Sequence, residues 1–467
     1  MTGTPPALPG SLLLGNALDL RADMLGTCER AFREHGEAVR LRIGPPRLGR
    51  ELWVTFHPDG AQRVLAGNSA NYRKDNIFYS EIRDAFGDGL LTSQDDDWQR
   101  QKRFLQPLFT QRHVAGYADA MAVHIEDLIG QWRAQPATVR DLDDAMTRLA
   151  LRIVCRVLFG NDIEQAIPVV QRRFGPLGEG VRKRSMAPVR LPRTWPTATN
   201  RTLTRAQREL FAVCDQIIAD RRARNAGEQD LLGLLLNARD SGTSMTDAEV
   251  RDQVLIFLLA GHETTSTALT FALYLLGRHP DVQKKVRAEV DEIGGVPTAA
   301  EASTLAYTTM VLKETMRVFP SAPLTGRRSV ADDEISGYLF PGGSDVLVAP
   351  WVTHRHPAFW ESPDVFDPSR FTPEREKARH RYAWFPFGGG PRACIGQHFS
   401  MLESTIALAG LVQNFTFTAT GDDPKYTNYI TLRPTTPVCV LVEPRPARRP
   451  RAARHLAASD SADVASP

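Results

Sequence analysis

Apolar residues recur at helical spacing over most of the chain, and only a few short segments alternate as strands do. The spacing predicts a helix over residues 24–36 and mostly helical structure from 114 to 240. Alternation and turn residues predict a hairpin from 39–44 and 51–56, and a terminal hairpin within 426–434. The pattern therefore predicts a mainly α fold with small β-sheets.

The longest apolar run begins after Thr246 and ends before Pro280. Thr246 and Glu249 match the capping box that often begins a helix. A helix from Thr246 to Gly277 would measure about 48 Å, so we expect it to cross the core of the molecule. Its middle, AGHETT at 260–265, is a polar interruption in an otherwise apolar run.

Two segments lack sustained periodicity and are predicted to be loops rather than packed helices. Residues 72–92 mix aromatics, charges and glycines, and residues 176–196 combine prolines with basic side chains. Directly after the first, DDDWQRQKRFLQPLF predicts a helix with acids in its first turn, capped by Ser93 or Asp95.

Composition fits one large globular domain. The chain has 467 residues, of which 42% are hydrophobic, and no Pro/Gly/Ser-rich linker divides it between about 10 and 442. We expect one domain over 10–443, a flexible N-terminus over 1–9 and a disordered tail, rich in Arg, Ala and Pro, over 444–467.

Charge and cysteine content argue against several classes of protein. A net charge of +3, with scattered basic residues and no DNA-binding motif, argues against nucleic acid as a partner. Five widely spaced cysteines without a C-x-x-C pair argue against a disulfide scaffold or a zinc site, and favour the reducing cytoplasm. No apolar run near the N-terminus approaches the ~20 residues that span a bilayer, so we expect no membrane anchor. We also expect a monomer.

One cysteine stands in a pattern with chemical meaning. In FGGGPRACIG (387–396), Cys394 follows a glycine-rich turn and precedes a predicted helix of about five turns. A helix N-terminus favours an anion, so we expect a pKa for the Cys394 thiol below its usual value of about 8.5, and a thiolate that can bind a metal. A lone cysteine beside a helix cap is more often a structural thiol, and the surrounding residues decide between the two.

The neighbours of Cys394 suit a flat macrocycle that carries carboxylates. Gly388, like the two glycines after it, allows close approach of the backbone, and Gly396 relieves crowding on the other side. Arg392 could reach a carboxylate at the edge of the ring, and Phe387 could pack under the ligand loop. Together these residue types suit a heme.

The polar interruption of the long helix carries a second chemical signal. Buried Glu263 and Thr264 would each need a hydrogen-bonding partner. Gly261, which follows Ala260, costs about 1 kcal/mol in a helix interior but lets a ligand approach the backbone, and threonine can bend the helix. We interpret His262 as structural.

Two further spacings place pairs of side chains on common helix faces. Glu314 and Arg317 are three residues apart and could form a bidentate pair, although E-x-x-R is also a common surface pair of little value. Trp98 and Lys102 are four apart. Alone they would indicate a packed tryptophan on a solvated helix.

The motifs W-x-x-x-K, A-G-x-E-T-T, E-x-x-R and F-x-x-G-x-R-x-C-x-G occur in this order along one chain. In them the chain resembles the cytochrome P450 family, with matching features over about residues 10–442. The resemblance implies the family's helical fold, heme b as cofactor, and Cys394 as the iron ligand, a thiolate that favours oxygen activation. It also implies that Glu263 and Thr264 deliver protons during that activation.

The same resemblance implies further heme contacts. Trp98 and Lys102 would hold a propionate, although lysine lacks the fork of the arginine that the family often has there. Arg327 would bind a propionate, with its neighbour Arg328 as the rival for that role.

It also implies a structural lock and a substrate pocket. Arg370 would join Glu314 and Arg317 and fix the segment that leads to Cys394, without a part in turnover. The loop over 72–92 would cover the substrate. The implied apolar pocket comprises Phe78, Tyr79, Ile82, Phe86, Leu90, Leu258, Leu259, Leu324, Thr325 and Tyr429.

The implied activity is a monooxygenase that hydroxylates or epoxidises a hydrophobic small molecule, with a terpenoid or polyketide favoured over a fatty acid or steroid. Electrons from NAD(P)H would arrive through a separate ferredoxin and ferredoxin reductase, docked near Arg100, Arg103 and Arg392. Three rivals stay open. They are a peroxide-using member of the family, which would normally lack the acid–alcohol pair, a heme-dependent isomerase or dehydratase, and a non-catalytic heme sensor.

Overall fold

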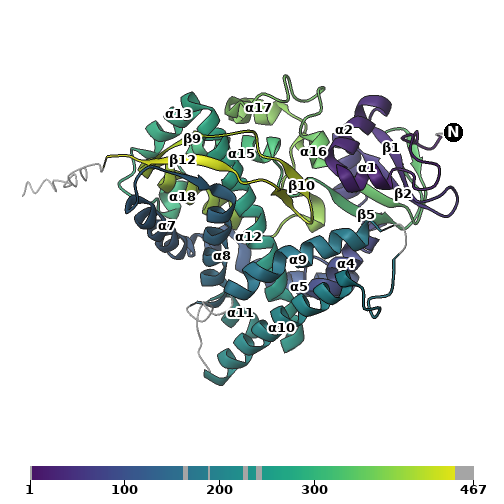
Figure 1. The fold of residues 1–467 in the computed structure, drawn as a ribbon, viewed down its shortest axis with the longest axis horizontal. Helices are drawn as coiled ribbons and strands as arrows, with labels where there is room; N and C mark the ends of the chain where they lie inside the picture. The colour runs from purple at the N-terminus through teal and green to yellow at the C-terminus, as the bar shows by residue number, and fades with distance from the viewer. Residues whose placement is uncertain (1–2, 161–166, 188–189, 225–229, 238–243, 447–467) are drawn as a thin grey trace, which may run out of the picture.

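The computed structural model describes residues 3–160, 167–187, 190–224, 230–237 and 244–446. Helices make up the larger part of the molecule, and the small sheets lie at one edge and across its centre (Figure 1). The predicted fold class, mainly α with small β-sheets, is confirmed.

The helices of the described residues are α1 (Ala17–Ala22), α2 (Met24–His35), α3 (Pro58–Gln62), α4 (Ile77–Phe86), α5 (Asp95–Leu105), α6 (Gln111–Ala115), α7 (Ala118–Arg133), α8 (Leu142–Phe159), α9 (Ile167–Ser185), α10 (Ala198–Arg224), α11 (Leu231–Asn237), α12 (Asp247–Arg278), α13 (Pro280–Val290), α14 (Ala299–Ala302), α15 (Ala306–Val318), α16 (Pro350–Thr353), α17 (Pro373–Ala378) and α18 (Gln397–Asn414). The strands are β1 (Ala38–Ile43), β2 (Arg50–Thr55), β3 (Tyr72–Arg73), β4 (Thr138–Asp141), β5 (Thr325–Ser329), β6 (Asp333–Ile335), β7 (Tyr338–Phe340), β8 (Asp345–Val348), β9 (Phe415–Ala419), β10 (Tyr426–Asn428), β11 (Leu432–Pro434) and β12 (Cys439–Pro444).

The long predicted helix is α12, and it begins as the sequence indicates. The Thr246 hydroxyl accepts a hydrogen bond from the Glu249 backbone N–H at 3.2 Å, and the Glu249 carboxylate accepts one from the Thr246 N–H at 2.7 Å. The helix packs against α8, α10, α15 and α18. Within the described residues it alone is long and apolar enough to cross a membrane, and 83% of its apolar window is buried inside the protein. Its apolar character is therefore accounted for by the core.

Both predicted hairpins form. β1 and β2 pair antiparallel at one edge of a five-stranded sheet with the order β1-β2-β8-β5-β3, in which β2 and β8 run parallel. β10 and β11 form a separate two-stranded hairpin, and β4, β12 and β9 form a third sheet that packs on α12. The five-stranded sheet holds β5, which carries one of the predicted heme contacts.

The prediction of a loop over 72–92 is wrong, because α4 lies within it. The Asn76 side chain accepts a hydrogen bond from the Tyr79 N–H at 3.1 Å and caps the first turn. Gly87, with φ of 90°, ends the helix. These two residues define the ends of the helix, and its buried face packs against α9, which stabilises a segment that the sequence pattern did not mark as helical.

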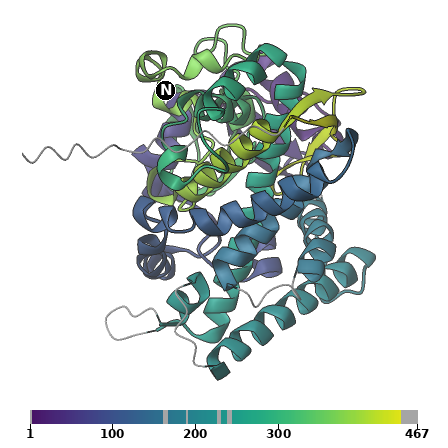
Figure 2. The ribbon, with the colours of Figure 1, turned by 90° about the vertical axis from the view of Figure 1, so that its left-hand side faces the viewer.

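The loop predicted for 176–196 is also shorter than expected, because α9 continues through Pro176 to Ser185. α9 packs on α4 and α10 through a buried face. This tertiary packing outweighs the helix-breaking tendency of proline. In Figure 2 the teal α10 forms the lower edge of the molecule.

Neither predicted cap of α5 acts as one. The N-cap residue is Gln94, without a side-chain cap. The Ser93 hydroxyl instead donates to the Gln101 side chain at 2.8 Å, and Asp95, with a positive φ of 46°, pairs with Arg73 at 2.8 Å.

The N-terminus is more ordered than predicted over residues 3–9. The Pro6 carbonyl accepts a hydrogen bond from the Arg40 N–H at 2.8 Å, and the Leu8 N–H donates to the Arg40 carbonyl at 3.0 Å. Leu8 is buried, so this segment lies along β1 as an added strand-like edge. The predicted tail over 444–467 falls, from residue 447 on, outside the described residues.

Candidate active site

A cavity of about 340 Å³ lies between the middle of α12 and the loop that precedes α18. From α12 it is lined by Ala260, Gly261 and Thr264, and from the loop by Phe387, Gly388, Arg392, Cys394 and Gly396. The structure thus brings together two motifs that lie far apart in the sequence. Apart from four cationic side chains, the wall is mostly apolar.

Glycines shape the cysteine loop. Gly388 and Gly390 adopt left-handed conformations, with φ of 70° and 64°. A Cβ on Gly390 would lie 1.9 Å from the Leu65 carbonyl oxygen, so no other residue fits there without movement of the backbone. The Cys394 N–H donates to the Phe387 carbonyl at 2.8 Å and closes the turn. The loop therefore presents the Cys394 side chain to the cavity.

The thiol of Cys394 does not have the lowered pKa that we predicted. Its side chain is reached from the cavity but is otherwise enclosed by protein, and this burial raises its pKa. The backbone N–H of Gly396 and the charge of Lys74 act in the opposite direction. Burial affects the pKa of Cys394 more than the positive end of the helix does, because α18 begins only at Gln397. Coordination to a metal would itself hold the sulfur as a thiolate.

Four cationic side chains line the cavity, namely Lys74, Lys102, Arg327 and Arg392. No carboxylate of the described residues lines it. The Arg392 guanidinium lies 4.0 Å from the ring centre of Trp98, and its buried Nη1 has no hydrogen-bonding partner in the described structure. Lys74 is buried, and burial together with Arg327 and Arg392 lowers its pKa. Such a cluster requires an anionic ligand. The two propionates of a heme fit this requirement.

The cluster contains Lys74, which the sequence analysis did not indicate. It also contains Arg327 and not its neighbour Arg328, the two residues between which the sequence analysis left the choice open. Lys74 stands in a segment without periodicity, so no pattern marks it. Arg327 is buried and faces the cavity, whereas Arg328 points to the other face of β5 and pairs with Asp345 at 3.2 Å. Lys102 lies at the rim, where its Nζ donates to the Pro391 carbonyl at 3.0 Å.

The middle of α12 forms a notch beside the cavity. The Thr264 hydroxyl donates to the Ala260 carbonyl at 2.7 Å, and the Thr264 carbonyl accepts from the Ser321 hydroxyl at 2.8 Å. A Cβ on Gly261 would lie 2.9 Å from a methyl group of Val154, so this glycine also lets α8 approach α12. Helix packing is thus a second reason for the glycine, beside access of a ligand.

Glu263 points away from the cavity that its neighbour Thr264 lines. Its carboxylate pairs with Arg433 and accepts a hydrogen bond from the Thr431 hydroxyl at 2.9 Å. Arg433 lies in strand β11 of the terminal hairpin, and Thr431 directly precedes that strand. His262 contacts the Phe174 ring at 5.3 Å, and burial lowers its pKa, as a structural histidine would show. The acid and the alcohol of the motif therefore occupy different environments.

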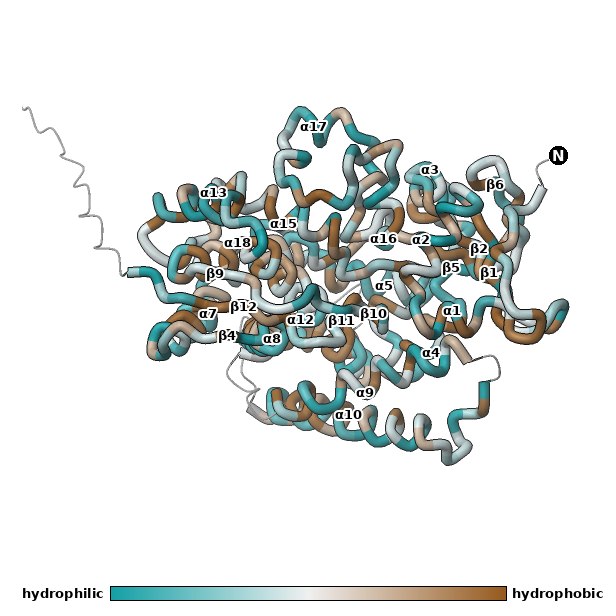
Figure 3. Tube along the Cα trace, turned by 45° about the horizontal axis from the view of Figure 1, so that its top comes forward, coloured by the Kyte–Doolittle hydropathy of each residue, from teal (hydrophilic) through white to brown (hydrophobic). Residues whose placement is uncertain are grey.

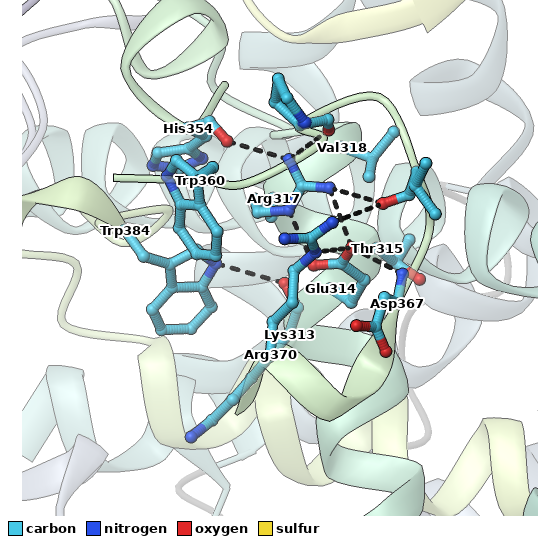
Figure 4. A network of polar contacts seen from close by, with 12 residues as sticks. Lys313, Glu314, Thr315, Arg317, Val318, His354, Trp360, Asp367, Arg370 and Trp384 are labelled. Atoms are coloured by element: carbon cyan, nitrogen blue, oxygen red, sulfur yellow. Dashed lines mark hydrogen bonds and ion pairs between the residues drawn. The ribbon is translucent and has the colours of Figure 1, made fainter. Parts of the chain in front are cut away.

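The three residues of the predicted lock are in contact (Figure 4). Glu314 and Arg317 form a fully buried bidentate pair, with N–O distances of 2.7 and 2.8 Å. The Arg370 Nε lies 3.4 Å from Glu314, and the Asp367 N–H donates to the same carboxylate at 2.9 Å. Arg317 also donates to the backbone carbonyls of three residues in the segment that leads toward Cys394, namely His354, Pro363 and Val365.

Comparison with known proteins decides the family. Residues 5–442 match the family model described as Cytochrome P450. This chain is a cytochrome P450. The heme domain of cytochrome P450DA superposes on the P450 fold described here with a TM-score of 0.86 at 29% identity, covering 96% of this chain and 99% of the other.

Three relatives of this P450 with named activities come from Streptomyces. Cyclooctatin synthase of Streptomyces melanosporofaciens is 38% identical over 86% of this chain and 88% of its own length. Cyclooctat-9-en-7-ol 5-monooxygenase of the same organism is 34% identical, with 89% of each chain covered. Pentalenene oxygenase of Streptomyces avermitilis is 31% identical, with 83% and 86% covered. Heme b as cofactor and monooxygenase activity follow from this membership.

The site can be stated in terms of P450 chemistry. A heme bound here supplies the activation of dioxygen. The cations Lys74, Arg327 and Arg392 would hold its propionates and Cys394 its iron. The apolar wall excludes water from the substrate, and Thr264 places a hydroxyl at the notch, where a proton can be held.

The substrate pocket agrees only in part with the predicted residues. Tyr79, Leu90 and Thr325 line the cavity of this P450. Phe78, Leu324 and Tyr429 line a second, smaller cavity of about 70 Å³. The other four pack in the core and line neither cavity: Ile82, Phe86, Leu258 and Leu259. One turn before Ala260 and Gly261, the apolar lining residues of α12 are Ile256 and Phe257, in place of the predicted Leu258 and Leu259.

The three arginines predicted to contact the redox partner, Arg100, Arg103 and Arg392, differ in their exposure and contacts. Arg100 pairs with Glu249 at 2.5 Å, and Arg392 faces the cavity, so neither presents its charge to an outside protein. Arg103 is exposed.

Proposed function

We propose that this cytochrome P450 inserts one atom of dioxygen into a cyclic terpenoid, as a hydroxyl group or an epoxide. The observation that carries the proposal is the apolar part of the wall of the cavity that Cys394 lines, which includes Val154, Ile256, Phe257 and Met316. The named relatives support the substrate class, since their names refer to cyclooctatin, cyclooctat-9-en-7-ol and pentalenene.

The reaction needs two electrons and two protons for each dioxygen, since the second oxygen atom leaves as water. We propose that the electrons come from NAD(P)H through a separate ferredoxin and its reductase, in the cytoplasm. We further propose that Thr264 passes protons into the cavity and that Glu263 supplies them once its carboxylate leaves Arg433. The hydroxyl of Thr264 at the cavity wall supports the first role.

The decisive experiment is reconstitution of the heme-loaded enzyme with a bacterial ferredoxin, ferredoxin reductase and NADPH. A panel of cyclic terpene hydrocarbons and alcohols is compared with fatty acids and steroids, under ¹⁸O-labelled dioxygen. We expect one labelled oxygen atom in a terpenoid product. Conversion without reductant would indicate an isomerase or dehydratase, and oxygen consumption at background level with every compound would indicate a heme sensor.

A further inference from the structure

We propose that Ser321 binds a hydroxyl group of the substrate, so that this P450 oxidises a terpenoid alcohol rather than a terpene hydrocarbon. Ser321 lies on the connection between α15 and β5 and lines the cavity that Cys394 also lines. The inference rests on the proposed function and narrows its substrate class.

Contacts with α12 and β11 fix the position of Ser321. Its hydroxyl donates to the Thr264 carbonyl of α12 at 2.8 Å, and its own carbonyl accepts a hydrogen bond from the Leu432 N–H of β11 at 2.9 Å. α12 and β11 are in contact and lie side by side near the centre of the molecule (Figure 3). Pro320 and Pro323 restrict the backbone on either side. The Ser321 side chain is therefore held at the cavity wall before a substrate arrives.

The hydrogen bonds at the notch use the protons of two hydroxyls and leave their lone pairs. A serine or threonine hydroxyl carries one proton and two lone pairs. Ser321 donates its proton to the Thr264 carbonyl, and Thr264 donates its own to the Ala260 carbonyl at 2.7 Å. None of the described residues donates a hydrogen bond to either hydroxyl oxygen. Both side chains line the cavity, so each presents an acceptor that can receive an O–H group.

Two other pairs of hydroxyls that line the cavity bond to one another. Tyr79 and Thr325 lie 3.3 Å apart, and Arg327 donates to Thr325 at 3.1 Å, which places this pair in the cation cluster. The second pair, with an O–O distance of 3.2 Å, is Thr265 and Ser400. Since Thr264 is proposed to pass protons, Ser321 is the acceptor at the notch that remains for the substrate.

An alcohol suits this acceptor better than a hydrocarbon does. The wall that Ser321 interrupts is mostly apolar and includes Ala322 and Met316. Moving an O–H group from water to an apolar wall is unfavourable unless the group finds an acceptor there. A hydrocarbon, in turn, would leave the Ser321 oxygen without a partner. A site with one placed polar group can therefore discriminate strongly against an analogue that lacks the hydroxyl.

This assignment gives the enzyme a place in a reaction sequence. A terpenoid hydroxyl arises when water captures the cation formed in ring closure, or when an oxygenase inserts an oxygen atom into the hydrocarbon. One of these two classes of reaction must precede the oxidation proposed here. The product then carries two oxygen functions on one ring skeleton.

The test is the binding of matched alcohols and hydrocarbons to the full-length, heme-loaded enzyme, followed by the spin state of the iron. The pairs are borneol and bornane, cedrol and cedrane, and ent-kauran-16-ol and ent-kaurane, which cover three sizes of skeleton. For the skeleton that binds most tightly, we expect wild type to bind the alcohol at least about tenfold more tightly than the hydrocarbon. Ser321→Ala should abolish this preference and leave the Kd of the hydrocarbon unchanged. Ser321→Thr, which keeps a hydroxyl, should retain the preference.

Tyr117→Phe is the matched control, because it removes another hydroxyl from the same cavity. The buried Tyr117 hydroxyl has no hydrogen-bonding partner in the described structure. Its ring contacts Phe399 near the beginning of α18, on the side of the cysteine loop. We expect Tyr117→Phe to keep the wild-type preference for the alcohol.

The proposal fails in any of three cases. Wild type could bind every hydrocarbon as tightly as its alcohol, Ser321→Ala could retain the preference, or Tyr117→Phe could lose it. Equal binding of alcohols and hydrocarbons, with oxidation of either, would leave the proposed function intact. A lack of binding by all six compounds would instead refute the terpenoid function itself. The heme content of each variant is measured alongside, so that a change in preference is separated from a loss of cofactor.

Discussion

Arg433, in strand β11, binds the carboxylate of Glu263 in the middle of α12, directly beside Thr264, which lines the cavity. Glu263 is 6% exposed and Arg433 29%. Replacement of Arg433 by Gln leaves a buried carboxylate without its cation. We expect the free energy of unfolding to fall by about 1–2 kcal/mol, discounted from the cost of breaking a fully buried pair because Arg433 is partly solvated.

Urea unfolding followed by circular dichroism measures this change. Arg278→Gln is the control, since Arg278 makes an exposed pair with Asp423 at 3.6 Å and should cost less than about 0.5 kcal/mol. Equal stability of Arg433→Gln and wild type would contradict the assigned ion pair.

Thr264→Ala should uncouple oxygen consumption from product formation. The hydroxyl at the notch is removed, whereas the apolar wall and the heme contacts stay in place. We expect unchanged substrate binding, product per NADPH lower by about tenfold or more, and a matching rise in hydrogen peroxide. Thr270→Ala is the control, because Thr270 lies in the same helix but does not line the cavity, and its hydroxyl donates to the Leu142 carbonyl at 3.4 Å. Unchanged coupling in Thr264→Ala would refute the proton role.

Glu314→Gln should cost far more than a surface substitution. It removes the charge that compensates buried Arg317, and we expect a loss of about 3–5 kcal/mol together with low heme content. Differential scanning fluorimetry and the heme-to-protein absorbance ratio measure both effects. Arg375→Gln should stay near wild type, because its contacts to Asp367 at 3.7 Å and to the Ser369 hydroxyl at 3.1 Å lie at the surface. A stable, fully loaded Glu314→Gln protein would disprove the lock.

Arg327 and Arg328 offer a matched test of the heme site. Arg327 faces the cavity, and Arg328 is 45% exposed on the opposite face of the same strand. We expect Arg327→Gln to release heme to an excess of heme-free globin at least about tenfold faster than wild type, since a charge-assisted hydrogen bond contributes about 1.5–3 kcal/mol. Arg328→Gln should retain heme as wild type does. Equal rates for the two variants would remove Arg327 from the site.

His354 should make the fold sensitive to acid. Its Nε2 accepts a hydrogen bond from the Phe385 N–H at 3.0 Å, and burial, with Arg317 and Arg355 nearby, lowers its pKa to about 3. In the unfolded chain His354 binds a proton below about pH 6.5, whereas in the folded protein it stays neutral down to about pH 3. Its contribution to the free energy of unfolding is therefore fully present above about pH 6.5 and is lost as the pH falls toward 3.

Unfolding free energies at pH 6.5 and 4.5 test this dependence. We expect wild type to lose about 2 kcal/mol more than His354→Gln between these two pH values. His113→Gln, a change of an exposed histidine, should keep the wild-type slope. A wild-type slope in His354→Gln would show that another group carries the acid sensitivity.

The sequence predicted those features that local patterns determine. The capping box of Thr246 and Glu249, the apolar run of α12 and the glycine turn before Cys394 each lie within a short stretch, and each folds as expected. α12 also shows where a local pattern was misread. Ile256 and Phe257 lie four residues before Ala260 and Gly261 and so share their helix face, whereas the predicted Leu258 and Leu259 are buried away from the cavity.

Local patterns do not predict contacts between distant segments, and the resemblance supplied only some of them, such as that of Arg370 with Glu314. Arg433 binds a carboxylate about 170 residues away, and Lys74 joins a cation cluster whose other members lie near residues 100, 327 and 392. The continuation of α9 through Pro176 likewise depends on its packing against α4 and α10. Only the tertiary structure determines these arrangements.

The close contact that Gly390 makes because it lacks a Cβ has a consequence for biosynthesis. Its backbone rests on the Leu65 carbonyl, which belongs to the first part of the chain to leave the ribosome, whereas the sulfur ligand is among the last. The proximal loop can take its final shape only after both ends have met, so cofactor capture should be a post-translational event that follows docking of the amino-terminal region.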